Sequence, residues 1–258
     1  MSRRRQRPAP IAIDLAPRLP IVDLLRGVAV AMMIAYHFCY DLSWFGWADF
    51  HMLSDARWIA WRTVIVASFL TLVGVSLVLA QRQTWRGYRR RLLQIAGCAL
   101  AVSLASAYQF GERFIYFGIL HFIVVATALG RLMMPMGLSV GFAGGAIIAF
   151  GYVFQSAAMN PRYLNWIGLA AEKPTTEDYV PLLPWLGVVL LGCAAAELWR
   201  RCDFRVTPFW GKLADRTPRW LFWLGRHSLL VYMLHQPIML FAIKIYSDMV
   251  APNFKAVV

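Results

Sequence analysis

The chain has 258 residues, of which 60% are hydrophobic and only 15% are charged. Soluble domains carry about 25% charged residues, and the apolar residues here stand in long continuous runs, so a soluble globular protein is excluded. Continuous runs also argue against a transmembrane β-barrel, whose strands alternate between apolar and polar residues. The composition therefore predicts an all-α, polytopic membrane helix bundle.

Apolar segments in chain order predict about seven transmembrane helices. Arginine and lysine cluster between alternate segments, which by the positive-inside rule puts the N-terminus in the cytoplasm and the C-terminus outside. This topology accounts for the net charge of +13, so anionic lipids are expected as partners and nucleic acid is not. The expected order is a basic cytoplasmic tail (1–20), a transmembrane bundle (21–247) and a short external tail (248–258). The predicted spans are 22–44, 58–80, 92–110, 114–131, 138–158, 181–199 and 220–246.

The first span carries three ionisable residues in the run VDLLRGVAVAMMIAYHFCYDL. At about 100° per residue, Arg26, His37 and Asp41 fall on one helix face. An ionisable side chain in hydrocarbon costs roughly 2.5 kcal/mol or more. A row of three on one face therefore points into the bundle and favours a functional site, with a buried structural network between helices as the alternative.

Two further histidines lie at a similar predicted depth. His121 is on the fourth span, and His235 is on the seventh, where Gln236 follows it. Counting along the helices at about 1.5 Å per residue puts both rings, with that of His37, in the outer half of the membrane. His37 and Asp41 also have the i, i+4 spacing of metal ligands, but H-E-x-x-H is absent and no cysteine partner is present, so neither a metal nor a bound cofactor is expected.

Several motifs in a fixed order resemble a known family. They are VDLLRGVAVAMMIAYHFCYDLSWFG, SFLTLVGVSLVLA, IYFGILHFI, DYVPLLPWLGVVLLG and WLGRHSLLVYMLHQP. The chain is similar over about residues 18–245 to the heparan-α-glucosaminide N-acetyltransferase catalytic-domain family in its short bacterial form, within the transmembrane acyltransferase superfamily. The resemblance departs at one point, because the animal enzyme's catalytic histidine lies in the loop after the first helix, where the nearest histidine here is His51.

The resemblance implies an acetyltransferase of the bacterial cytoplasmic (inner) membrane. The sequence leaves open whether the protein forms a homo-oligomer. Its donor would be cytoplasmic acetyl-CoA, and its acceptor a glycan or amino-sugar amine or hydroxyl on the outer side. His37 would act as general base or accept the acetyl group, and Asp41 would orient its imidazole. His121, His235 and Gln236 would hold the acceptor or the developing oxyanion.

Cations at the cytoplasmic end are expected to bind the phosphates of the donor. The candidates are Arg26 on the first span, Arg226 near the inner end of the seventh, and Arg89 and Arg90 between the second and third spans. Such a reaction requires a passage through which a thioester from inside meets an acceptor from outside.

The alternative function is a proton-coupled small-molecule transporter or exporter, because intramembrane His, Asp and Arg also mark proton relays. A non-catalytic membrane scaffold is a third interpretation.

Overall fold

The computed structural model describes residues 19–81 and 83–250. This part of the chain is helical and holds no β-strand, only an isolated bridge between Ser156 and Ala170, so the all-α prediction is confirmed. The predicted basic tail lies outside the described residues except for its last two. The predicted external tail lies outside them except for residues 248–250, which belong to the last helix.

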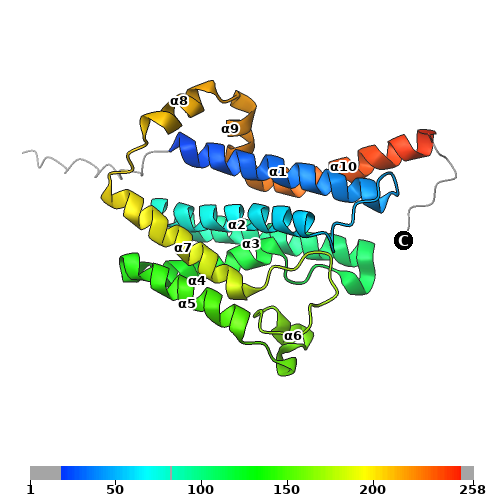
Figure 1. Cartoon of the computed structure of the whole chain (residues 1–258), viewed down its shortest axis with the longest axis horizontal. Coiled ribbons are helices and arrows are strands. Elements are labelled where there is room, and N and C mark those ends of the chain that lie inside the picture. Colours follow the sequence, from blue (N-terminus) through cyan, green and yellow to red (C-terminus); the bar gives the residue numbers. More distant parts are fainter. Residues whose placement is uncertain (1–18, 82, 251–258) are drawn as a thin grey trace, which may run out of the picture.

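Most of the helices are joined by short connections, and longer loops lie at residues 45–55 and 166–181 (Figure 1). They are α1 (Pro20–Trp44), α2 (Ala56–Leu79), α3 (Trp85–Phe110), α4 (Ile119–Met133), α5 (Val140–Val153), α6 (Arg162–Asn165), α7 (Leu182–Arg201), α8 (Pro208–Arg216), α9 (Arg219–Arg226) and α10 (Ser228–Val250), with 3-10 turns at Gly111–Arg113, Met134–Ser139 and Ala157–Met159.

Within the described part of the chain, six segments are long and apolar enough to cross a membrane: Pro20–Trp44, Ala56–Leu79, Trp85–Arg113, Ile119–Val153, Leu182–Arg201 and Ser228–Met249. One of them, Ile119–Val153, contains two helices, α4 and α5. They meet at a kink where Gly137 adopts a left-handed φ of 59°. Each has 15 or fewer residues, short of the roughly 20 that span a bilayer. The expected count of seven spans stays a prediction.

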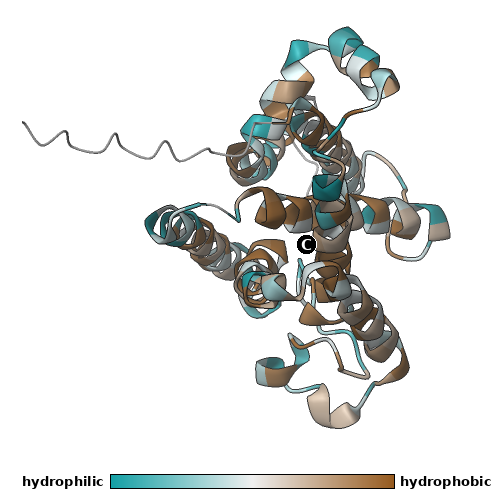
Figure 2. Cartoon of the chain, turned by 90° about the vertical axis from the view of Figure 1, so that its left-hand side faces the viewer, coloured by the Kyte–Doolittle hydropathy of each residue, from teal (hydrophilic) through white to brown (hydrophobic). Residues whose placement is uncertain are grey.

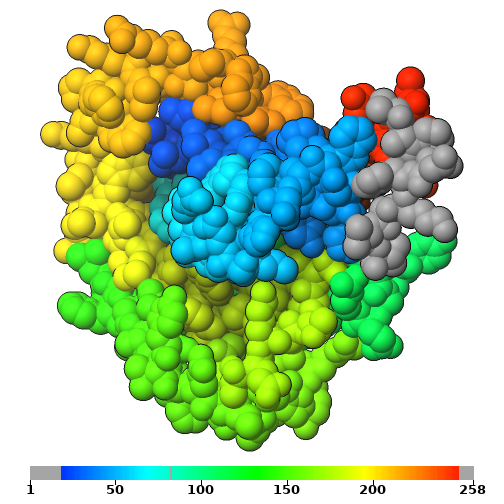
Figure 3. All heavy atoms as spheres, turned by 45° about the vertical axis from the view of Figure 1, so that its right-hand side comes forward, coloured from blue at the N-terminus to red at the C-terminus, as the bar shows by residue number. Residues whose placement is uncertain are grey.

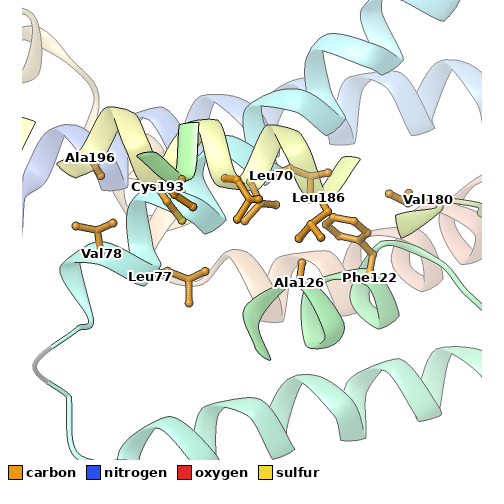
Figure 4. Close-up of a cluster of buried hydrophobic side chains, with 12 residues drawn as sticks. Leu70, Leu77, Val78, Phe122, Ala126, Val180, Leu186, Cys193 and Ala196 are labelled. Carbon is orange, nitrogen blue, oxygen red and sulfur yellow. The ribbon is translucent and has the colours of Figure 1, made fainter. Parts of the chain in front are cut away.

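Contacts show that the chain reverses direction between α4 and α5. Gly130, near the end of α4, lies against Leu77 near the end of α2, whereas Gly151, near the end of α5, lies against Pro184 at the start of α7. Helices α2 and α7 run parallel, because Val78 lies near Ala196 at one side of their shared core while Leu70 lies near Leu186 further along it (Figure 4). Helix α4 therefore runs toward the end where α2 finishes, and α5 runs back.

The main hydrophobic core lies where α2, α4 and α7 meet (Figure 4). Leu70, Phe122, Val189 and Leu190 are fully buried there. Since lipid tails are as apolar as leucine, close packing rather than the hydrophobic effect holds such helices together. Glycines at the α5–α7 and α2–α7 crossings let the helix backbones come close together. Figure 4 shows the buried side chains that pack between the helices.

Two predicted boundaries differ from the helix ends by more than five residues. Helix α3 begins at Trp85, not at residue 92, because Thr84 caps it by accepting a hydrogen bond from the Gly87 N–H. The apolar run did not reveal these first turns because they are basic. The predicted span 220–246 is wrong at its start, because the helix breaks at His227 and α10 begins at Ser228. Arg226 therefore belongs to the separate helix α9.

Helix α8 lies in the predicted loop before the seventh span, and α9 lies at the start of that predicted span; together they form a hairpin. In Figures 1 and 3 it stands out sideways from the first half of α1. Gly225 allows α9 to approach the backbone of α1 closely at Asp23 and Gly27. We call the end of the bundle that holds this hairpin and the start of α3 the basic end, and the opposite one the far end.

Neighbouring glycines on α5 test the packing against α7. A Cβ added at Gly144 would lie 2.8 Å from the Gly187 carbonyl oxygen, whereas one added at Gly145 would meet nothing within 4 Å. We expect Gly144→Ala to destabilise the protein by about 1–3 kcal/mol through overpacking. Gly145→Ala should be neutral or slightly stabilising, since alanine favours helix by about 1 kcal/mol. Thermal unfolding of the two variants in detergent measures the difference, and equal melting temperatures would contradict this packing.

Candidate active site between helices α1 and α10

Two of the predicted histidines lie together at the contact between α1 and α10. The ring centroids of His37 and His235 are 4.9 Å apart, with an interplanar angle of 67°. The Nδ1 of His37 lies 3.0 Å from the Met33 carbonyl oxygen, and the Nδ1 of His235 lies 2.7 Å from that of Tyr232. Because a carbonyl oxygen only accepts, each Nδ1 is assigned the proton, which leaves the lone pair on Nε2.

Asp41 is held by α10 rather than by the neighbouring histidine. Its side chain is buried, and its Oδ1 accepts a hydrogen bond of 2.6 Å from Gln236 Nε2. Asp41 was expected to orient the His37 imidazole, but in the structure the Met33 carbonyl oxygen is the group that His37 Nδ1 contacts. The carboxylate instead joins the two helices that carry the imidazoles.

Three buried polar atoms at this contact have no hydrogen-bond partner among the described residues: Asp41 Oδ2, His235 Nε2 and Gln236 Oε1. With the protons assigned as above, all three can only accept hydrogen bonds. Leaving a buried acceptor unpaired costs about 1–3 kcal/mol. The cluster therefore suits a ligand group that carries several N–H or O–H donors.

Aromatic side chains border His37 on the side of α2. The Tyr36 ring makes an edge contact with the His37 ring, their centroids 6.0 Å apart, and it also contacts Trp58 and Trp61. Phe50 extends this group, its centroid 5.1 Å from that of Trp58. Trp58 and Trp61 are thus connected to His37 through the Tyr36 ring that lies between them.

His121 lies away from this pair. Its Nε2 is 3.0 Å from Ser103 Oγ, and its Nδ1 accepts from the Gly118 N–H at 3.3 Å. Both ring nitrogens are thus engaged in the connection between α3 and α4. No contact joins this ring to His37 or His235 within the described residues. Of the three histidines expected at a similar depth, only His37 and His235 therefore meet.

One carboxylate near the site was missing from the sequence-based site residues. Asp178, in the loop before α7, accepts from the Ile119 N–H at 2.9 Å and so caps α4. Asp178 lies close enough to Tyr232, three residues before His235, for the two groups to interact electrostatically, and burial raises the pKa of the Asp178 carboxyl above its ordinary value. In the same loop, burial raises the pKa of Tyr179 to about 12. No local pattern signals these contacts, because Asp178 and Ile119 are 59 residues apart.

At the basic end, two candidate donor-binding arginines share one carboxylate. Arg26 Nη1 lies 3.2 Å from Asp23 Oδ1, and Arg226 Nε lies 3.9 Å from Asp23 Oδ2. Arg26 also donates to Ser76 Oγ at 2.9 Å and to the Gly225 carbonyl. The Asp23 carboxylate of α1, the Ser76 hydroxyl of α2 and the Gly225 carbonyl of α9 thus converge on this arginine.

The other two candidates lie apart from that cluster. Arg89 and Arg90 are exposed on the first turns of α3, where they line a surface hollow together with Arg86. Their neighbour Arg91 is close enough to Arg26 for the two charges to repel each other. A second hollow lies along α9, and His37 lines neither of them.

The hydrogen bond between Asp41 and Gln236 can be tested by its energetics. Gln236→Leu leaves the buried carboxylate without a partner and should destabilise the protein by about 1–3 kcal/mol. Replacing both partners, in Asp41→Leu/Gln236→Leu, should recover much of that loss because no buried group is then left unpaired. Chemical unfolding in detergent measures all three proteins. A double variant that is the least stable of the set would show that the pair does not act as described.

The family model described as "Heparan-alpha-glucosaminide N-acetyltransferase, catalytic" matches residues 18–237. No curated protein and no solved structure matches the chain.

Proposed function

The chain belongs to the heparan-alpha-glucosaminide N-acetyltransferase catalytic family, a family of membrane acetyltransferases, and we propose that it moves an acetyl group from acetyl-CoA to a sugar amine or hydroxyl across a bacterial cytoplasmic membrane. The observation that carries this proposal is the pair of imidazoles at the α1–α10 contact, where three buried acceptors are unpaired among the described residues, one of them His235 Nε2. Acetyl-CoA is a co-substrate here, and the proposal needs no resident cofactor.

The hydrogen-bonding capacity of the site favours an amine as the acceptor group. Asp41 Oδ2, His235 Nε2 and Gln236 Oε1 all accept hydrogen bonds. An amine offers two N–H donors, or three when protonated, whereas a hydroxyl offers one. The Nδ1–H of neutral His235 is already bonded to a backbone carbonyl. The free Nε2 can therefore accept a hydrogen bond from the sugar amine, but it cannot donate one to an oxyanion.

In the proposed reaction, His37 is the general base. Its Nε2 lone pair takes a proton from the acceptor nitrogen while that nitrogen attacks the thioester carbonyl carbon. The C–N bond forms, the C–S bond breaks, and the CoA thiolate leaves with the electron pair. The same lone pair could instead receive the acetyl group first, but direct transfer needs fewer steps.

The donor would approach from the basic end. Arg26 and His37 are eleven residues apart on α1, which corresponds to about 16 Å along a helix. Phosphates of CoA bound at Arg26 and Arg226 would replace Asp23 as their anionic partner, and the exposed Arg89 and Arg90 would attract the donor to this end. The slim pantetheine arm would then have to pass between α1 and its neighbours to reach the imidazole.

Loss of the proposed base should abolish most of the activity. With purified protein, acetyl-CoA and glucosamine as the acceptor probe, His37→Ala should lower the rate of CoA thiol release about 10²–10⁴-fold. His51→Ala is the matched control, because His51 is an exposed loop residue whose contact is with Asp49, and it should keep the parental rate. Equal loss in both variants would argue against His37. Proton-coupled substrate flux without thiol release would favour the transporter alternative.

The donor side is tested by the kinetics at Arg26. Removing a hydrogen-bonded charge should raise the KM for acetyl-CoA by about tenfold or more in Arg26→Gln, with a smaller effect on kcat. Arg201→Gln, an exposed cation at the same end, should leave KM unchanged. In oriented vesicles, acetyl-CoA should be consumed only from the side that carries the basic end. An unchanged KM in Arg26→Gln would remove this residue from the donor site.

A further inference from the structure

The α8–α9 hairpin carries a concentration of exposed apolar side chains outside the proposed active site. Phe209, Trp220 and Trp223 are 67%, 58% and 51% exposed, and Trp210 and Leu213 are exposed beside them. The hairpin stands out sideways from α1 at the level of its first half (Figures 1 and 3). Its outer face is therefore directed toward the surroundings of the bundle rather than over its end.

Positive charge accompanies these apolar residues. Residues 208–226 contain Lys212, Arg216, Arg219 and Arg226 against one acidic residue, Asp215. Among the described ion pairs of this segment, only Arg226 has an acidic partner. Residues 1–18, outside the described part, add five arginines and one aspartate to the composition. Viewed from the basic end, Figure 2 shows the hairpin as a mixture of polar and apolar residues beside a predominantly apolar bundle.

A hollow on α9 combines the two features. It is lined by Arg219, Trp220, Phe222, Trp223 and Arg226, so guanidinium groups lie at both ends of an aromatic stretch. Arginine binds phosphate oxygens through paired N–H groups, and tryptophan favours the level of the lipid headgroups.

We propose that the α8–α9 hairpin is a binding surface for anionic phospholipids, with a headgroup phosphate held in the α9 hollow. Amphipathic helices that lie in the membrane interface have this arrangement, with aromatic side chains among the acyl chains and cations at the anionic surface. The exposed tryptophans argue for a lipid over a soluble anion, because a soluble anion would leave their apolar surface in contact with water. This inference goes beyond the proposed transferase activity and does not depend on it.

The test is lipid binding to the purified full chain in detergent, followed by native mass spectrometry with phosphatidylglycerol and phosphatidylcholine. Lys212→Gln/Arg219→Gln should weaken phosphatidylglycerol binding by about fivefold for each removed charge. The matched control Arg57→Gln/Lys173→Gln removes two exposed cations from the far end and should bind as the parent does. Phosphatidylcholine binding should be weaker and equal in all three proteins.

A further measurement keeps the proposal open to refutation. Raising the salt concentration should weaken phosphatidylglycerol binding to the parent protein more than to Lys212→Gln/Arg219→Gln, because screening acts on the charges that this variant lacks. Equal affinity of the parent for both lipids, or no effect of the double substitution, would overturn the lipid assignment, whatever the outcome of the transferase assays.

Discussion

The hydrogen bond between Gln236 and the buried carboxylate of Asp41 is the contact on which the proposed site depends. It fixes α10 against α1 at the level where His37 and His235 meet. In a membrane no water is available to take the place of a lost partner. The register between these helices is therefore specified by polar atoms, whereas most of α10 presents exposed apolar side chains such as Ile238 and Phe241.

The two halves of the bundle are held together in different ways. Helices α2, α5 and α7 approach through glycine, as at Gly74 and Gly187, and surround a fully apolar core. Helices α1 and α10 meet through hydrogen bonds and aromatic contacts instead. A rigid, closely packed half thus supports a more polar contact, and a polar contact with unpaired acceptors is better suited to admit a substrate than a glycine crossing is.

The sequence predicted what depends on local pattern. Apolar runs located the helices. The spacing of His37 and Asp41 predicted that both lie on one face of the first span and point into the bundle, and in the structure both contact α10. The sequence could not predict that Met33, rather than Asp41, would bind His37, nor that His121 would be engaged by Ser103. Those outcomes depend on side-chain direction and on neighbours distant in sequence. The break at His227 was missed because WLFWLG and SLLVYML are equally apolar on either side of it.

Helix α1 connects the two clusters from which the proposed chemistry is built. Near the start of α1, Asp23 and Arg26 contact α9. Further along α1, His37 and Asp41 contact α10. Helices α9 and α10 are separated by His227 alone, so both partners of α1 belong to nearly continuous chain. An anion that draws Arg226 away from Asp23 would act on α9 and, through this short connection, on the helix that carries His235. In the proposed reaction, donor binding at the basic end and acceptor binding near His37 would therefore act on the same pair of helix contacts, which would give a physical means of coupling them.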